Sequence, residues 1–258
     1  TKFSIASIPP LRYLTSTMTR LYLIAITAFL AACTASPRPD VPVMPTGGQP
    51  MPDEWIDQDT GHKIIRLTTG SKGGRSFYFH NNPFLKDDNG NDLMIFYADV
   101  DTLRRLLSVN LATRQIEVIT ERPGRYTGEI VAPKRKEVFY QNHDSVFATH
   151  AITKETRLVY VFPDDFKGRI TTVNANETLL AGTYSEPVKD SIYRRHPDKG
   201  SYFTRIYEAK IPHTLFTLDI ATGELNKIYS ERAWLNHVQF SPTDPDLLMY
   251  DHEGPWHL

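Results

Sequence analysis

A repeat of about 43 residues is the feature that most constrains the fold of this chain. Four short apolar segments end in a similar way at residues 97, 140, 183 and 250, so successive ends lie 43, 43 and 67 residues apart. The last interval is one period plus an insertion of 24 residues, and the polar, tyrosine-rich stretch 185–210 accounts for it. Four-stranded units that recur roughly every 40–45 residues are typical of β-propeller blades. The repeat therefore predicts a β-propeller.

A second set of segments recurs once in each repeat. Residues 108–113, 148–153 and 217–222 each precede a turn and a further strand-like run. After the N-terminal segment, no window of helical length carries a sustained apolar stripe with helical spacing, which predicts strands throughout. We therefore expect an all-β fold, with a β-sandwich of evenly spaced hairpins as the alternative.

The repeat also sets the expected number and register of the blades. From Asp53 onward the chain has room for an incomplete propeller of about four to five blades. Tyr97, Tyr140 and Tyr250 are expected at equivalent places in successive blades. Phe240-Ser-Pro242 resembles the tight turn that joins the two inner strands of TolB-like blades.

The balance of charge and the cysteine content exclude several classes of protein. The chain has 29 basic and 30 acidic side chains, a net charge of −1, which argues against a nucleic-acid-binding protein. Its single cysteine, Cys33, excludes a disulfide framework, a thiolate zinc site and a CxxC redox centre.

The first 52 residues carry the features of a targeting segment and a linker. Residues 18–33 combine a basic start, a short apolar run and small residues, as in a secretory signal. Leu30-Ala-Ala-Cys33 resembles a bacterial lipobox, which predicts lipidation of Cys33 and a membrane-anchored lipoprotein in the periplasm. The alternative is an ordinary signal peptide with an incidental cysteine. Residues 1–17 are expected to be translated upstream sequence, and the proline-rich stretch 34–52 is expected to be an extended tether.

Histidines at predicted strand ends are the first candidates for chemistry. His80 ends an aromatic strand-like run, and His237 begins a strand of the innermost type. His252 and His257 flank a short Glu-Gly-Pro-Trp segment. The ends of inner strands from different blades converge at the mouth of a propeller channel, where ligands bind. Spacing alone leaves metal-site, acid–base and structural roles open, and residues 53–258 contain no HExxH, GxSxG, P-loop or GxGxxG motif.

Four segments together resemble the oligogalacturonate lyase family, in order and at fitting separations, from about Asp53 to the end of the chain. They are EWIDQDTGH (54–62), RSFYFH (75–80), WLNHVQFSPTDP (234–245) and HEGPWH (252–257). The resemblance implies a seven-bladed propeller in the complete family fold. It also implies cleavage of short unsaturated oligogalacturonides, such as digalacturonate, by β-elimination.

The resemblance also implies roles for particular residues. His237 matches the general base of the family, and the expected substrate-binding residues are Arg75, His80, Arg205, Gln239 and His252. The family places an arginine near the strand before the base, but residues 212–215 (Pro-His-Thr-Leu) contain none, so Arg205 or Lys210 is expected to substitute.

The family uses a divalent metal, typically Mn²⁺, held by three histidines and a glutamine. We expect these ligands beyond Leu258, so that residues 1–258 contain no metal ligand and are inactive alone. The C5 proton of a uronate becomes acidic once the adjacent carboxylate is neutralised, which a metal does as a Lewis acid. A neutral histidine can then remove the proton.

The rival hypothesis is a non-catalytic TolB-like propeller that binds a protein or glycan partner at the cell surface. It shares the repeat and the Phe-Ser-Pro turn. A later cluster of histidine and glutamine would distinguish the lyase from it. In either case, we expect no nucleic-acid partner and membrane contact only through a lipid anchor at Cys33.

Overall fold

The computed structural model of this chain describes residues 41–69, 73–120 and 126–255. The chain divides into two units, of which the first ends at Ile65 and the second begins at Arg66. The signal segment, Cys33 and His257 lie outside the described residues. Among the residues described, no helix is both long and apolar enough to cross a membrane.

The first unit contains a three-stranded sheet in the order β1-β2-β3. Its strands are β1 (Val43–Met44), β2 (Glu54–Asp57) and β3 (Lys63–Ile65), with β1 parallel to β2 and β3 antiparallel to it. Strand β1 lies inside the proline-rich stretch that we expected to be a tether. Thr46 explains its attachment, because its hydroxyl accepts a hydrogen bond from Trp55 Nε1 at 2.8 Å and donates one to the Asp57 carboxylate at 2.6 Å.

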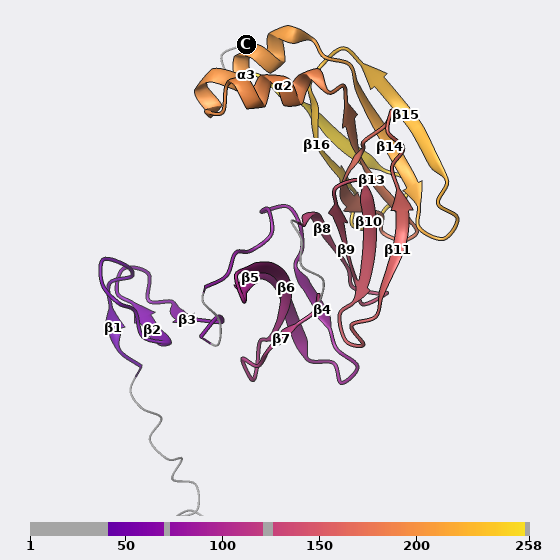
Figure 1. Ribbon diagram of the computed structural model, residues 1–258. Coiled ribbons are helices and arrows are strands. Elements are labelled where there is room, and N and C mark those ends of the chain that lie inside the picture. Colours follow the sequence, from indigo (N-terminus) through magenta and orange to yellow (C-terminus); the bar gives the residue numbers. More distant parts are fainter. Residues whose placement is uncertain (1–40, 70–72, 121–125, 256–258) are drawn as a thin grey trace, which may run out of the picture. The chain divides into compact units, whose positions relative to one another are not determined.

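The second unit consists of three four-stranded antiparallel sheets and one antiparallel pair (Figure 1). The first sheet is β4 (Phe84–Lys86), β5 (Asp92–Val100), β6 (Leu103–Asn110) and β7 (Ile116–Val118). The second is β8 (Thr127–Ala132), β9 (Glu137–Asn142), β10 (Ser145–His150) and β11 (Thr156–Val161). The third is β12 (Arg169–Val173), β13 (Leu179–Ser185), β14 (His213–Asp219) and β15 (Leu225–Glu231), and the pair is β16 (Leu235–Phe240) with β17 (Leu248–His252).

One sequence repeat corresponds to one blade of the structure, that is, to one four-stranded sheet. Tyr97, Tyr140 and Tyr250 lie in β5, β9 and β17, each of which is the second strand of its sheet or pair. The second set of segments covers the ends of the third strands and the turns that follow. The prediction of an all-β fold with propeller-type blades is therefore confirmed.

The first strands of the blades pack against one another, β4 against β8, β8 against β12, and β12 against β16. Each of the last three also carries a β-bulge, where the register with the second strand shifts. A bulge bends the strand and re-aims the side chains beside it. The strands that pack side by side are therefore also strands whose side chains are redirected by a bulge.

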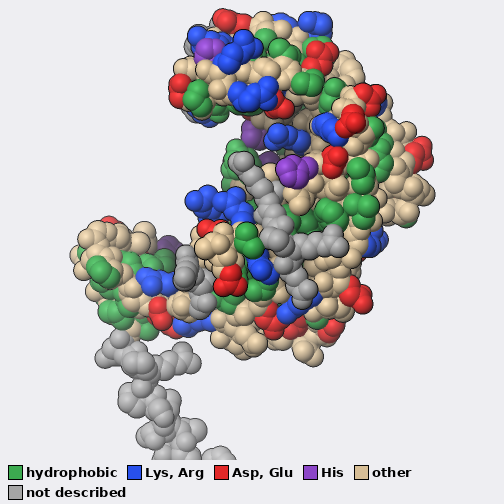
Figure 2. All heavy atoms as spheres, in the orientation of Figure 1, with side chains coloured by type: hydrophobic (Ala, Val, Ile, Leu, Met, Phe, Trp, Pro, Cys, Tyr) green, Lys and Arg blue, Asp and Glu red, His purple; other side chains and the backbone are tan. Residues whose placement is uncertain are grey.

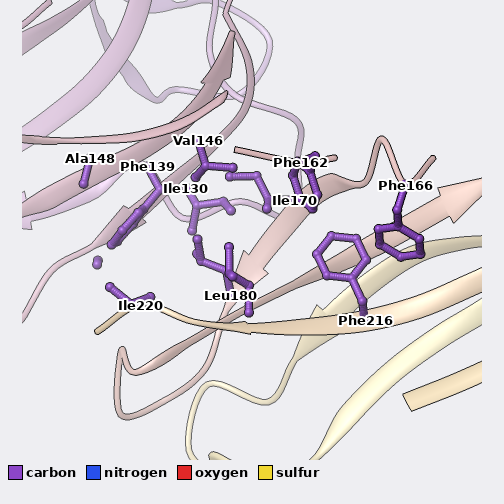
Figure 3. Packing of buried hydrophobic residues seen from close by; sticks show 12 residues of the cluster. Ile130, Phe139, Val146, Ala148, Phe162, Phe166, Ile170, Leu180, Phe216 and Ile220 are labelled. Atoms are coloured by element: carbon purple, nitrogen blue, oxygen red, sulfur yellow. The ribbon is translucent and has the colours of Figure 1, made fainter. Parts of the chain in front are cut away.

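One hydrophobic cluster joins the second and third sheets (Figure 3). Ile130 and Phe139 contribute to it from the second sheet, and Leu180 and Phe216 from the third. Phe162, in the connection between the sheets, packs edge-on against Phe216 with ring centroids 5.4 Å apart. These sheets therefore share a core rather than having one each.

The insertion between β13 and β14 is helical, which corrects the expectation of strands throughout. It forms α2 (Val188–Arg195) and α3 (Lys199–Ala209), which Figure 1 shows beside the third sheet. The helices are short, with 8 and 11 residues, so the few apolar positions of each do not form a sustained stripe in the sequence. Tertiary packing supplies the missing stability, because Ile206 is buried in a cluster with Trp234.

Candidate active site

His237 occupies an unusual backbone conformation in the β16 bulge. Two residues, His237 and Val238, lie opposite Tyr250 alone, between the pairs Asn236–Asp251 and Gln239–Met249. The φ angle of His237 is 46°, in the left-handed region that residues with a Cβ rarely adopt. Such strain is concentrated at functional sites, where the surrounding structure maintains it.

The equivalent bulge in β8 shows what the backbone alone prefers. There, Gly128 and Glu129 lie opposite Tyr140, and Gly128 takes a φ of 68°. Gly128 is thus the counterpart of His237, and glycine adopts this conformation without steric cost. The histidine in β16 carries a conformational cost that glycine avoids, which indicates a role for its side chain.

A carboxylate and an amide fix the position of the His237 ring. Glu253 Oε2 lies 3.1 Å from His237 Nε2 and accepts a hydrogen bond from Asn236 Nδ2 at 2.8 Å. The Asp251 carboxylate is also close, because ligating atoms of His237, Asp251 and Glu253 all lie within 4.8 Å of one another. Burial is the main cause that raises the pKa of Asp251, and the charge of Glu253 adds to it.

Aromatic side chains from the segment before β4 cover the other side of His237. The Tyr78 ring stacks on His237 with centroids 5.7 Å apart and an angle of 18° between the planes. The His80 ring meets His237 edge-on at 6.0 Å. Burial lowers the pKa of His80, with a further contribution from His237. His80 is therefore held more firmly in its neutral form than a free histidine.

His80 and Gln239 line one cavity of about 270 Å³, together with residues from β8 and β12. His80 thus connects the other two sequence-predicted residues, because its ring contacts His237 and it shares this cavity with Gln239. The remaining predicted residues lie elsewhere.

His252 is directed away from His237. Its Nε2 lies 2.8 Å from Glu231 Oε2, and its ring lies beside Tyr250. Successive residues of a strand point to opposite faces, so the side chain of Asp251, not that of His252, reaches His237. The structure does not support a place for His252 in this pocket.

The predicted cations are also separate from this site. Arg75 forms a backbone bridge with Tyr97 and is exposed. Arg205 is exposed on α3 and donates to the Ser201 carbonyl, while Lys210 lies 3.9 Å from the Tyr207 ring centroid. Neither side chain has a described contact with His237, so the substitution of Arg205 or Lys210 for the missing arginine stays a prediction.

Three side chains at the site were not predicted from the sequence, namely Tyr78, Asp251 and Glu253. Tyr78 and Glu253 lie inside segments 75–80 and 252–257, next to the histidines that carry the resemblance. Strand alternation around His252 could have identified Asp251 and Glu253 as the pair that shares a face.

The nitrogen of His237 and the carboxylates of Asp251 and Glu253 form a donor set that fits a divalent cation such as Mn²⁺. In the described part of the chain, this is the group of histidine and acidic side chains that could hold a metal. Glu253 Oε2 already accepts from Asn236 and contacts His237, so the same atoms also form a histidine–carboxylate pair.

Four-stranded antiparallel blades, with a histidine oriented in the bulge of a first strand, place this protein in the class of β-propeller proteins. A protein-family model described as oligogalacturonate lyase matches residues 52–258. The chain belongs to the oligogalacturonate lyase family.

Two curated relatives agree with this assignment. The chain is 27% identical over 207 residues to the oligogalacturonide lyase of Pectobacterium atrosepticum and, over the same length, to the oligogalacturonate lyase of Dickeya dadantii. Each alignment covers 79% of this chain and 52% of the relative. The chain therefore spans about half the length of the curated relatives it matches.

Two solved structures share the fold. The oligogalacturonate lyase of Vibrio parahaemolyticus has a TM-score of 0.66 and 26% identity, covering 78% of this chain and 52% of that one. An oligogalacturonate lyase in complex with manganese has a TM-score of 0.67 and 25% identity, covering 79% of this chain and 53% of that one.

Proposed function

We propose that this chain is part of a lyase that cleaves short unsaturated oligogalacturonides by metal-assisted β-elimination, with His237 as the general base. Family membership supports the reaction class. The observation that carries the assignment of the base is the position of His237, in a left-handed bulge with Glu253 at 3.1 Å.

The pair of His237 and Glu253 has the geometry that a base requires. The carboxylate accepts a hydrogen bond from Nε2–H of the imidazole, which leaves the lone pair on Nδ1 to take the C5 proton of the uronate. The negative charge of Glu253 also stabilises the imidazolium that forms. Asn236 holds the carboxylate in place, and Tyr78 holds the ring from its stacked side.

A divalent metal, when bound, supplies positive charge that neutralises the carboxylate of the uronate. The manganese complex of a related lyase supports Mn²⁺ as this metal. We propose that its ligands lie beyond Leu258, as expected from the sequence. The described side chains that could hold it instead are His237, Asp251 and Glu253. His237 is available as a base only if the metal ligands lie elsewhere, because a histidine that binds the metal cannot also take the proton.

The test is His237→Gln in the full-length protein, with digalacturonate as substrate. Turnover is followed by the absorbance of the C4–C5 double bond that β-elimination creates, and bound Mn²⁺ is measured in parallel. A positioned base contributes about 10²–10⁴-fold, so we expect a loss of that order with the metal retained.

The outcomes separate the alternatives. Loss of metal together with activity would make His237 a ligand. Near-parental turnover would move the base to His80. Asp251→Asn is the matched variant, because it removes a charged donor of the same set while leaving the His237–Glu253 pair intact. Metal retention in Asp251→Asn is expected if the ligands lie elsewhere.

A further inference from the structure

A second cavity, of about 270 Å³, lies beside the His237 site. Strands β12 and β13, helix α2 and the start of β16 form its walls. Asn236 connects the two sites, because it lines this cavity and donates to the same Glu253 oxygen that contacts His237. A molecule in the cavity would therefore lie next to one at His237.

Two cations in this cavity have no carboxylate bound to them. Arg169, at the start of β12, and Lys189, on α2, both line it, and neither forms an ion pair within the described part of the chain. Lys167 is different, since Asp164 and Asp144 neutralise it at 2.8 and 3.3 Å. Asp164 and Asp190 are the acidic residues of the lining, so the cavity has one more cation than carboxylate.

Lys189 is held in place by two side chains. His213 is buried, and its Nδ1 donates to the Ile211 carbonyl at 2.8 Å. That bond leaves Nε2 as an acceptor, which Lys189 Nζ meets at 3.0 Å. Lys189 also lies over the Trp234 ring, 5.0 Å from its centroid. The ammonium group is thus fixed in position with no carboxylate in ion-pair contact, and the charges of Asp190 and Glu253 act on it only from a longer distance.

Burial is the main cause that lowers the pKa of Lys189, to about 8, and the charge of Arg169 lowers it further. Burial also lowers the pKa of His213, to about 4, so His213 stays a neutral acceptor. An anion bound between the two cations would relieve their repulsion. Figure 2 shows further Lys and Arg side chains (blue) on the helical segment that contributes Lys189.

We propose that this cavity is a uronate subsite, in which Arg169 and Lys189 bind the carboxylate of the sugar next to the one at His237. The proposal rests on the proposed function, because an oligogalacturonide carries a carboxylate on every sugar. The volume is close to the lower end of ligand pockets, roughly 300–1,000 Å³, which suits one sugar unit. The helical insertion would then be part of the substrate-binding site, because it contributes Lys189.

The test measures binding of galacturonate, which has no glycosidic bond and cannot turn over. The full chain, Arg169→Met and Lys189→Met are titrated by ligand-observed NMR. Arg194→Met is the control, because Arg194 is exposed on α2 and bonds to Ser191 of the same helix. Galactose and inorganic phosphate are titrated as ligands without the carboxylate and without the sugar.

We expect the parent and Arg194→Met to bind galacturonate and not galactose, with each cavity variant weakened by roughly 10-fold or more, as for one lost charged hydrogen bond. Equal affinities in all four proteins, or no binding by the parent, would overturn the subsite. Phosphate that competes as well as galacturonate would overturn its specificity for uronates. The proposed function has its own test. It would be contradicted if His237→Gln left β-elimination unchanged, even if Arg169→Met and Lys189→Met still bound galacturonate more weakly than the parent.

Discussion

At His237, backbone conformation and side-chain chemistry favour different residues. The bulge in β16 places this residue at a φ of 46°, where its counterpart in β8 is Gly128. The same bulge also points the imidazole at Glu253 and Tyr78. We therefore expect the left-handed conformation of His237 to lower the stability of the protein. Substitutions of His237 can separate the cost of this conformation from the function of the side chain.

We predict that His237→Gly unfolds at a higher urea concentration than His237→Ala. A residue with a Cβ costs roughly 1–2 kcal/mol in the left-handed conformation, and glycine avoids this cost, so the two variants should differ by about 1 kcal/mol. Equal midpoints would show that the bulge relaxes. The control is Gly128→Ala, which should be destabilised more strongly, because its Cβ would lie 2.6 Å from the Ile170 carbonyl oxygen.

Glu129, the second residue of the β8 bulge, gives a prediction about pH. It is only 8% exposed, and its Oε1 has no hydrogen-bond partner within the described residues. Burial raises the pKa of Glu129 to about 7 from an ordinary 4.5. The folded state thus binds more protons than the unfolded state between these values, so this residue lowers stability as pH rises from 4.5 to 7.

Glu129→Gln should therefore stabilise the protein at pH 8 but not at pH 4.5. The pKa difference corresponds to at most about 3 kcal/mol. Thermal unfolding at the two pH values measures it, with the exposed Glu155→Gln as control. A change that is the same at both pH values would show that Glu129 is solvated in the folded state.

The sequence could identify His237, His80 and Gln239, because these residue types stand in motifs that resemble the family. It could not reveal that Glu253 faces His237, since that depends on the bulge and on the pairing of β16 with β17. The sequence also could not show which cations lie near the site. Lys189 reaches its cavity through the packing of α2, which no local pattern of the sequence records.

Among the elements, strands were predictable and helices were not. The blades recur because four strands and three turns need a similar length of chain each time, so their period appears in the sequence. Helices α2 and α3 occur once and bury one face only partly, with Ile206 as the buried residue of α3. Both helices pack against Trp234, which lies more than twenty residues further along the chain.

The N-terminus of α3 provides a prediction at this scale. Asp198 caps it, and its Oδ1 accepts a hydrogen bond from Ser201 N at 2.8 Å. Asp198→Ala should lower the free energy of unfolding by about 1 kcal/mol, the usual cost of a lost cap. Asp198→Asn keeps an acceptor and should remain close to the parent. A similar loss in both variants would mean that charge, not the cap, stabilises α3.

At the scale of the whole molecule, we propose that the mature protein begins at a lipidated Cys33 and is anchored in the periplasm. The motivation is the Leu30-Ala-Ala-Cys33 motif after an apolar run. Cys33→Ala should move the protein from the membrane to the soluble fraction, measured by immunoblotting of fractionated cells. Identical fractionation of parent and variant would contradict the lipobox.

The core that the second and third sheets share determines how this part of the chain opens. Phe139 and Phe216 belong to one cluster although they lie in different sheets. Removing either sheet exposes the apolar face of the other, so the two should behave as a single cooperative unit in native-state hydrogen exchange. Amides of β9 and β13 should then exchange with the same opening free energy. A single blade of these two should therefore not unfold on its own, although the sequence repeat makes each blade look like a separate unit.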